Sequence, residues 1–222
     1  MDFIFMLTRQ DRTVPDCLEV LERIASLPLR HIGFKDVGIE PARMQELNRR
    51  IHAAGALSYL EIVSEDGAAE ERAARLALEL GVDRLLGGTE VAAVRRVLAG
   101  SHIEYYPYPG RPAGHPTRLA GSPEQIAEDC RGLLSAGCTG ANLLAYRATD
   151  AEPLALVRAA RAALGGAPLI VAGNVDSPRR VRELAEAGAQ AFTVGSAIFE
   201  NRFAPRTPGL EAQLRAVLRA CP

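Results

Sequence analysis

The chain has 222 residues, 48% of them hydrophobic, and its mean hydropathy is close to zero. That much apolar material can form one sizeable core, so we expect a single domain spanning residues 1–222. Acidic and basic residues are interspersed and the formal net charge is −1. This pattern excludes an extended basic surface, so we expect neither nucleic acid nor a membrane as a partner.

The first seven residues are apolar except for Asp2, and charged residues follow from Arg9 onwards, so the apolar segment is too short for a signal peptide or a membrane span. The four cysteines show no C-x-x-C spacing, which predicts reduced thiols. They are Cys17, Cys130, Cys138 and Cys221. Together these features predict a cytoplasmic protein.

Apolar strand-like runs alternate with helical patterns along the whole chain. The helices are expected to begin near residues 13, 41, 68, 89, 122, 150, 177 and 209. The strands are expected at 2–8, 30–36, 57–63, 82–86, 102–106 and 140–146, with two more beginning at 168 and 191. Several helices end in a glycine suited to a left-handed C′ position, namely Gly55, Gly81, Gly137 and Gly188.

Eight βα units of roughly 28 residues predict an α/β fold, the (β/α)₈ or TIM barrel, with eight parallel strands. An open doubly wound sheet is the alternative, but that fold carries its phosphate-binding glycines in the first unit, and none appear there. Barrels of this size often pair, so a homodimer is compatible with the sequence, although no interface can be identified from it.

The segment 107–121 interrupts this alternation of strands and helices and contains four prolines and three glycines. It is longer than a usual βα connection, and long loops in compact domains tend to carry function. Its cationic side chains, Arg111, His115 and Arg118, could close on an anionic substrate. We therefore interpret 107–121 as a lid, with His115 and Arg118 as substrate-binding residues.

The last two strands each end in a small residue followed by a helical start. Gly173-Asn174 precedes Ser177-Pro178, and Gly195-Ser196 precedes another short helix. Small residues allow backbone N–H groups to approach an anion closely, and helix starts add unpaired donors. These two strand-to-helix turns together predict a phosphate site at the end of a barrel, formed by Gly173, Asn174, Gly195 and Ser196.

The segment from Leu169 to Phe199 resembles the last quarter of the ribulose-phosphate-binding barrels, an aldolase-type TIM-barrel superfamily. The group includes isomerases of histidine and tryptophan biosynthesis, sugar-phosphate epimerases and orotidine-monophosphate decarboxylases. The resemblance implies a phosphorylated metabolite as ligand. The decarboxylases carry an Asp-x-Lys-x-x-Asp run, which this chain lacks because Gly33 and Gly38 stand where the acids would be.

Lys35, at the expected end of the second strand, is the only lysine of the chain beside 25 arginines. An amine can lose its proton, whereas a guanidinium effectively cannot. A lysine retained at a strand end therefore indicates a base, an acid or an imine-forming nucleophile. The alternative is an incidental solvated lysine in an arginine-rich chain.

Three carboxylates accompany Lys35 as candidate catalytic groups. Asp36 follows it directly, Glu61 lies in an otherwise apolar strand, and Asp11 follows the first strand. A buried carboxylate has a raised pKa suited to general acid/base catalysis. Glu61 could equally be a satisfied polar residue inside the barrel, and Asp11 with Arg9 could equally form a solvated turn.

Further substrate contacts are expected from Arg9, which could bind a carboxylate, and from Asn142 and Tyr146 on the sixth strand. The four histidines do not follow the strand-end pattern of metal-dependent epimerases, so neither a metal nor another cofactor is expected.

The sequence thus predicts an enzyme acting on a small phosphorylated sugar or sugar acid. The first hypothesis is a lyase or aldolase in which Lys35 forms an imine and Glu61 or Asp36 moves protons. The second is an isomerase or epimerase in which Lys35 stabilises an enolate. The third is a barrel that binds a phosphorylated metabolite without turnover.

Overall fold

The computed structural model describes residues 1–63, 66–114 and 116–222, and within them eight parallel strands form one sheet. The strand order is β10, β11, β12, β1, β4, β5, β6, β7. Their bounds are β1 Asp2–Met6, β4 His31–Lys35, β5 Leu57–Glu61, β6 Arg84–Leu86, β7 Glu104–Tyr106, β10 Ala141–Leu143, β11 Leu169–Val171 and β12 Ala191–Val194.

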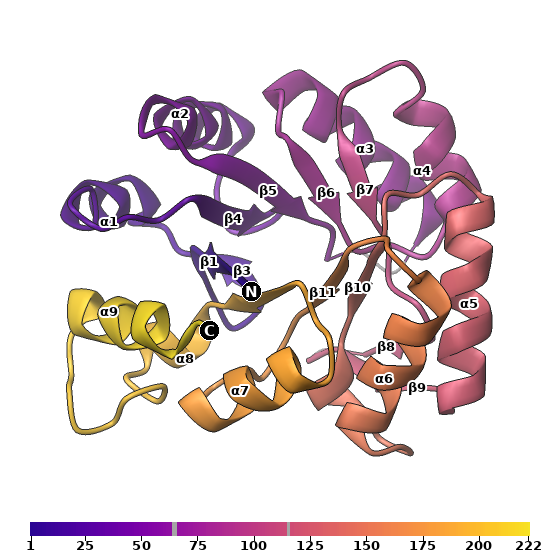
Figure 1. The fold of residues 1–222 in the computed structure, drawn as a ribbon. Helices are drawn as coiled ribbons and strands as arrows, with labels where there is room; N and C mark the ends of the chain where they lie inside the picture. Colours follow the sequence, from indigo (N-terminus) through magenta and orange to yellow (C-terminus); the bar gives the residue numbers. More distant parts are fainter. Residues whose placement is uncertain (64–65, 115) are drawn as a thin grey trace.

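The sheet closes into a barrel between its two outer members, β7 and β10. Asn142 donates its backbone N–H to the carbonyl of Pro107 at 2.9 Å, and Thr139 donates to the carbonyl of Tyr105 at 3.0 Å. Helices surround the strands on the outside (Figure 1). The predicted (β/α)₈ fold is therefore confirmed.

Most helices begin within three residues of the expected positions, but the first begins at Cys17 and not at 13, because Arg12–Thr13 pairs with Thr8–Arg9 as a short hairpin. The helices are α1 Cys17–Arg23, α2 Pro41–Ala53, α3 Gly67–Leu80, α4 Val91–Val97, α5 Pro123–Ser135, α6 Pro153–Leu164, α7 Pro178–Glu186, α8 Ser196–Phe199 and α9 Leu210–Ala220. Gly55, Gly81, Gly137 and Gly188 all have positive φ, as the C′ prediction requires. Among the described residues, no helix is long and apolar enough to cross a membrane.

Alternation along each strand produces two cores. Phe3 and Phe5 of β1 pack in the large cluster shared with the helices, whereas Ile4 and Met6 belong to a second cluster inside the barrel. The same alternation places Phe34 outside and Lys35 inside. Lys35 therefore ends β4 with its side chain facing the open end of the barrel interior.

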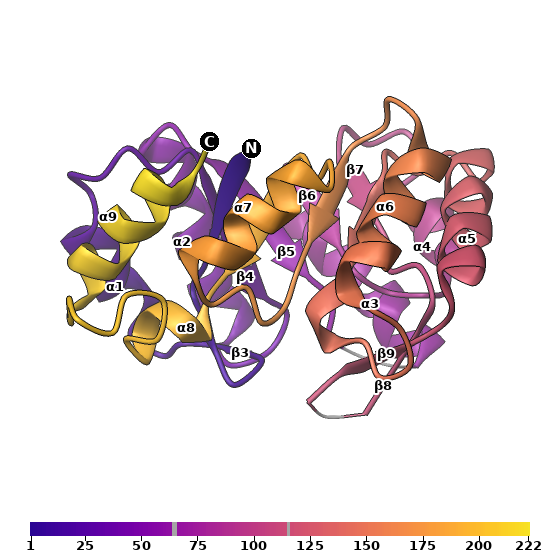
Figure 2. The same cartoon turned by 60° about the horizontal axis from the view of Figure 1, so that its bottom comes forward.

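Two hairpins add to the barrel at this open end. The first pairs β2 (Thr8–Arg9) with β3 (Arg12–Thr13), and the second pairs β8 (Arg111–Ala113) with β9 (Arg118–Ala120). Figure 2 shows β3, β8 and β9 together at the end of the barrel away from the termini. The long segment expected as a lid is thus folded in part as a hairpin.

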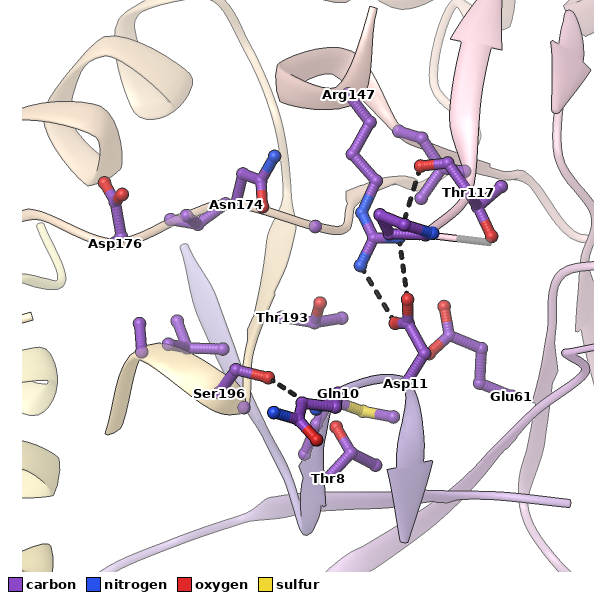
Figure 3. A pocket seen from close by; sticks show the side chains of 18 of the residues that line it. Thr8, Gln10, Asp11, Glu61, Thr117, Arg147, Asn174, Asp176, Thr193 and Ser196 are labelled. Carbon is purple, nitrogen blue, oxygen red and sulfur yellow. Dashed lines mark hydrogen bonds and ion pairs between the residues drawn. The ribbon is translucent and has the colours of Figure 1, made fainter. Parts of the chain in front are cut away.

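The sixth barrel strand is shorter than predicted. It ends at Leu143, and the next residues form a 3₁₀ turn, η1 (Ala145–Arg147). The turn directs Arg147 over the barrel mouth instead of along the strand (Figure 3).

Gly38 allows the first hairpin to approach β4. Its φ is +110°, and a Cβ built there would lie 2.4 Å from the carbonyl oxygen of Thr13. Gly38→Ala is therefore expected to lower the free energy of unfolding by about 3 kcal/mol, because left-handed strain and steric overlap add. Gly55→Ala is the control: φ is +75° but no described heavy atom lies within 4 Å of that Cβ, so the expected loss is about 1 kcal/mol. Urea unfolding measures both, and equal losses would contradict the close-approach explanation.

Candidate functional site

Lys35 lies between two carboxylates at the barrel mouth. Its Nζ is 2.9 Å from Asp11 Oδ1 and 3.2 Å from Glu61 Oε2. The side chains are 10%, 11% and 5% exposed, respectively. A buried ammonium requires such partners, because leaving its charge uncompensated would cost several kcal/mol. Three of the predicted catalytic residues are thus brought together.

The first hairpin positions Asp11 beside Lys35 at the barrel mouth. Gln10 and Asp11 form its two-residue turn and have φ values of +51° and +56°. Hairpin turns adopt this left-handed conformation, which aspartate tolerates better than glutamine. Thr13 fixes the hairpin to β4, since its Oγ1 accepts from the N–H of Lys35 at 2.8 Å and donates to the Lys35 carbonyl at 2.9 Å. The strained turn therefore places a carboxylate over the barrel.

Arg147 binds the carboxylate of Asp11 through both of its terminal nitrogens (Figure 3). Its Nη1 and Nη2 donate to the two carboxylate oxygens at 3.1 and 2.9 Å, and Nη1 also donates to the carbonyl of Thr117 at 3.3 Å. Sequence reasoning missed this residue because it is one of 25 arginines and the contact spans 136 residues. It joins the turn, the β8–β9 loop and η1 at one point.

Gly173 makes room for this guanidinium. A Cβ at Gly173 would lie 2.4 Å from Nε of Arg147, and φ there is +77°. The role of this glycine in phosphate binding stays a prediction, and the structure shows a different reason for a glycine here, the passage of the Arg147 side chain. The Nε atom itself is buried and has no hydrogen-bond partner among the described residues.

The ion pairs determine the charge states of Lys35 and Asp11. Burial alone would lower the pKa of Lys35, but the neighbouring Glu61 and Asp11 carboxylates outweigh it and raise that pKa. Burial alone would raise the pKa of Asp11, but Arg147 and Lys35 hold it well below its usual range. At neutral pH Lys35 is therefore an ammonium ion and not a free amine. The imine hypothesis requires the free amine.

Glu61 has a different second partner. Tyr108 donates its hydroxyl to Oε1 of Glu61 at 2.7 Å. Burial and the Glu61 charge raise the pKa of this tyrosine well above its usual value, so the phenol keeps its proton. Gly87 leaves space for the ring, because a Cβ there would lie 2.7 Å from Tyr108 Cε2. Glu61 thus accepts a hydrogen bond from Tyr108 on one oxygen and forms an ion pair with Lys35 through the other.

All four residues of the predicted phosphate site line the same cavity as these groups. The cavity, of about 200 Å³, extends from Lys35 and Glu61 to Gly173, Asn174, Gly195 and Ser196, and we call it the main cavity. The hydroxyl of Ser196 accepts the N–H of Gln10 at 3.2 Å (Figure 3), and its own proton has no acceptor among the described residues.

The charges around the main cavity nearly balance. Its acids are Asp11, Glu61, Asp176 and Glu200, and its bases are Lys35, Arg147 and Arg202, a difference of one. The two acids near Ser196 are themselves paired: Arg180 lies 3.0 Å from Asp176, and Arg202 Nε lies 2.7 Å from Glu200. A bound phosphate would have to be stabilised by local N–H, hydroxyl and guanidinium donors, because the cavity as a whole is not cationic.

The remaining predicted residues lie elsewhere. Asp36 is turned away from the main cavity and accepts the N–H of Val63 at 3.1 Å. Arg9 is exposed on β2, and Asn142 is fully buried inside the barrel with neither amide atom paired among the described residues. None of these three lines the main cavity.

Tyr146 and Arg118 line a separate, open depression that shares Arg147, Thr117 and Asn174 with the main cavity. The Tyr146 hydroxyl donates to Glu183 at 3.2 Å. His115 lies outside the described residues.

Burial raises the pKa of Asp36 to about 6. Because the folded state holds this proton more tightly than the unfolded state, stability falls as pH rises from about 4 to about 6 and stays reduced at pH 7. Asp36→Asn is expected to raise the free energy of unfolding at pH 7 by about 2 kcal/mol, discounted for partial exposure, with no gain at pH 4.

The control is Asp83→Asn. Hydrogen bonds from Ser58 and His52 overcome partial burial and lower the pKa of Asp83, so this substitution is expected to reduce stability at neutral pH. Urea unfolding across the pH range measures both variants. A loss of stability in Asp36→Asn at pH 7 would contradict the burial argument.

Comparison with known proteins shows the fold alone. Neither family models nor curated protein sequences match the chain. Among solved structures, orotidine 5′-phosphate decarboxylase from Pyrococcus horikoshii OT3 superposes with a TM-score of 0.67 at 14% identity, covering 98% of each chain. A mandelate oxidase variant with an FMN adduct gives 0.66 at 15% identity over 98% of this chain and 71% of its own. A designed cage-forming fusion protein gives 0.69 at 13% identity, over 99% and 73%. The chain is a (β/α)₈ barrel similar in fold to these proteins.

Proposed function

We propose that the protein is an enzyme that moves a proton next to the carbonyl group of a small phosphorylated sugar or sugar acid, in a lyase or isomerase reaction that passes through an enolate. The observation that carries the proposal is Lys35, held as an ammonium ion between Asp11 and Glu61 on the wall of the main cavity. Catalysis of this type needs a fixed positive donor and a carboxylate base in one site.

Lys35 supplies the positive donor. An ammonium has three N–H groups. One of them is hydrogen-bonded to Asp11, Glu61 forms an ion pair with the ammonium group at 3.2 Å, and no other partner of this group is found in the described parts of the chain. The ammonium group therefore has an N–H available for a substrate oxygen, where it would stabilise the negative charge that develops in an enolate.

Glu61 is the better proton carrier of the two carboxylates. The pKa of Asp11 is held far down by Arg147 and Lys35, which makes Asp11 a weak base. Glu61 lies on the same cavity wall, and its second oxygen is in contact with Tyr108. We assign proton transfer to Glu61 and the positioning of Lys35 to Asp11.

Ser196, Gly195, Gly173 and Asn174 would hold the phosphate at the other end of the main cavity. The free hydroxyl proton of Ser196 and the Arg202 guanidinium nearby are suitable donors. Orotidine 5′-phosphate decarboxylase, one of the structures similar in fold, has a phosphorylated substrate in its name. At 14% identity that similarity supports only the choice of probes.

The test is hydrogen exchange in D₂O, followed by proton NMR. Dihydroxyacetone phosphate and ribulose 5-phosphate are compared with their unphosphorylated forms, and the phosphorylated compounds are expected to exchange protons next to the carbonyl faster. Lys35→Met and Glu61→Gln are each expected to lower the exchange rate at least ~100-fold. Glu79→Gln, on the exposed face of α3, is the matched control and should stay within about two-fold of the parent.

Several results would contradict the proposal. An undiminished exchange rate in Lys35→Met would contradict the proposal that Lys35 stabilises an enolate. Retention of a phosphorylated compound without exchange would leave only the binding hypothesis. A borohydride-stable adduct mapped to Lys35 would replace the ammonium role with the imine chemistry of the first hypothesis, because reduction captures only an imine.

A further inference from the structure

A second, smaller cavity adjoins Lys35. It has a volume of about 50 Å³ and shares Lys35, Tyr108 and Thr117 with the main cavity. Its other lining residues come from the ends of β5 and β6, from α3 and from the β8–β9 hairpin, and are Ile62, Val63, Glu70, Gly88, Thr89 and Pro112. We call it the side chamber. Lys35 and Tyr108 thus stand where two cavities meet, with the predicted phosphate site in only one of them.

The side chamber offers hydrogen-bond acceptors and, among its described lining residues, no free cation. Its carboxylate, Glu70, is 1% exposed and accepts the N–H groups of Thr89 and Glu90 at 2.8 to 2.9 Å. Thr89 donates its hydroxyl to Glu70 at 3.2 Å, which leaves the Thr89 oxygen as an acceptor. The lining cation is Lys35, which is already neutralised by Asp11 and Glu61. A second phosphate or a carboxylate would be repelled there, whereas a neutral hydroxyl-bearing group would find partners.

The volume limits the size of that group. A water-sized position needs on the order of 10–15 Å³, so 50 Å³ holds about four non-hydrogen atoms. A hydroxyaldehyde of two carbons has this size. An isomerase has no need for a separate chamber of this kind beside its proton-transfer residues, because its substrate stays in one piece.

We propose that the enzyme makes or breaks a carbon–carbon bond at the junction of the two cavities. The phosphorylated fragment stays in the main cavity, and a small neutral hydroxycarbonyl fragment occupies the side chamber. This inference rests on the proposed function and narrows it to an aldol-type lyase.

The cleavage step can be written with groups that are in place. The β-hydroxyl of the substrate gives its proton to Tyr108 Oη while Tyr108 passes its own proton to Glu61 Oε1, over the existing 2.7 Å hydrogen bond. The electron pair of the broken O–H bond forms the second carbon–oxygen bond of the carbonyl group in the neutral fragment. The electrons of the breaking carbon–carbon bond move onto the oxygen of the phosphorylated fragment, as an enolate paired with Lys35.

The cycle closes when the enolate carbon takes up the proton held by Glu61, which restores the carboxylate and releases a phosphorylated carbonyl compound. No oxidant, reductant or further reactant is consumed. Tyr108 contacts both cavities and Glu61, so the step assigns it the transfer of the hydroxyl proton.

The experiment runs the reaction in the synthetic direction. Each phosphorylated compound that shows hydrogen exchange is mixed with glycolaldehyde, which is neutral and fits the volume of the side chamber, or with glyoxylate, which is similar in size but anionic. Mass spectrometry measures the condensation product. Glycolaldehyde is expected to give product at least ~10-fold faster than glyoxylate, because the lining described for the side chamber holds no free cation.

The outcomes separate the two proposals. Exchange without condensation with any aldehyde would overturn the lyase inference and leave the proposed function standing as an isomerase. Faster condensation with glyoxylate than with glycolaldehyde would overturn the assignment of the side chamber. Absence of exchange with every compound would overturn the proposed function and this inference together.

Two variants test whether condensation depends on the side chamber. Val63→Phe fills the side chamber, while the backbone N–H that bonds Asp36 is unchanged, so the ratio of condensation to exchange is expected to fall at least ~10-fold. Leu78→Phe makes the same kind of change on the exposed face of α3 and should leave the ratio unchanged. An unaltered ratio in a folded Val63→Phe protein would contradict the inference.

Tyr108→Phe removes the hydroxyl that relays the proton. The same ratio is expected to fall at least ~10-fold in this variant. Tyr105→Phe, on β7 just before Tyr108, is its control, since the Tyr105 hydroxyl is buried without a partner in the described residues and lies outside both cavities. An equal fall of the ratio in both variants would contradict the relay.

Discussion

The ammonium group of Lys35, enclosed by Asp11 and Glu61, is the constraint on which the rest of the barrel mouth depends. A charge buried to this degree is tolerated only if its partners are fixed in place, because the loss of one partner would leave an uncompensated ion. Asp11 is fixed by Arg147, and Glu61 is fixed by Tyr108. The charges alternate along this row of side chains, so the cluster is electrically neutral although each member is an ion or a strong dipole.

Loops from distant parts of the chain must come close together to build this row, and glycines make the close approach possible. Gly38 admits the first hairpin, Gly87 admits the ring of Tyr108, and Gly173 admits Arg147. At each place a Cβ would lie within 2.7 Å of the neighbouring group, and φ is positive. The glycines of the mouth therefore serve the assembly of the site, and Gly173 also borders the cavity in which a phosphate is proposed.

Much of the fold could be predicted from the sequence, because strand alternation, helix caps and C′ glycines are local signals. The capping box of Ser122 and Gln125 and the left-handed Gly81 are examples. Lys35 could also be selected as a candidate catalytic residue at a strand end, since it is the single lysine in a chain that otherwise uses arginine. Arg147 could not, because its importance arises from a contact made across 136 residues. The orientation of Asp36 could not be predicted either. Lys35 and Asp36 are neighbours, so only one of them faces the cavity, and the sequence alone does not decide which.

The protonation state of Lys35 is the most direct point to measure, because a permanent ammonium ion in the resting site is central to the proposed chemistry. Since the chain has one lysine, labelling with ¹³C-lysine gives a single side-chain Cε signal, whose shift follows the protonation of Nζ. We expect no titration of this signal between about pH 6 and pH 9, and a lowered pKa when Asp11→Asn removes one carboxylate. A parent protein whose Lys35 signal moves to the neutral amine below about pH 8 would contradict the ammonium assignment and support the imine mechanism instead.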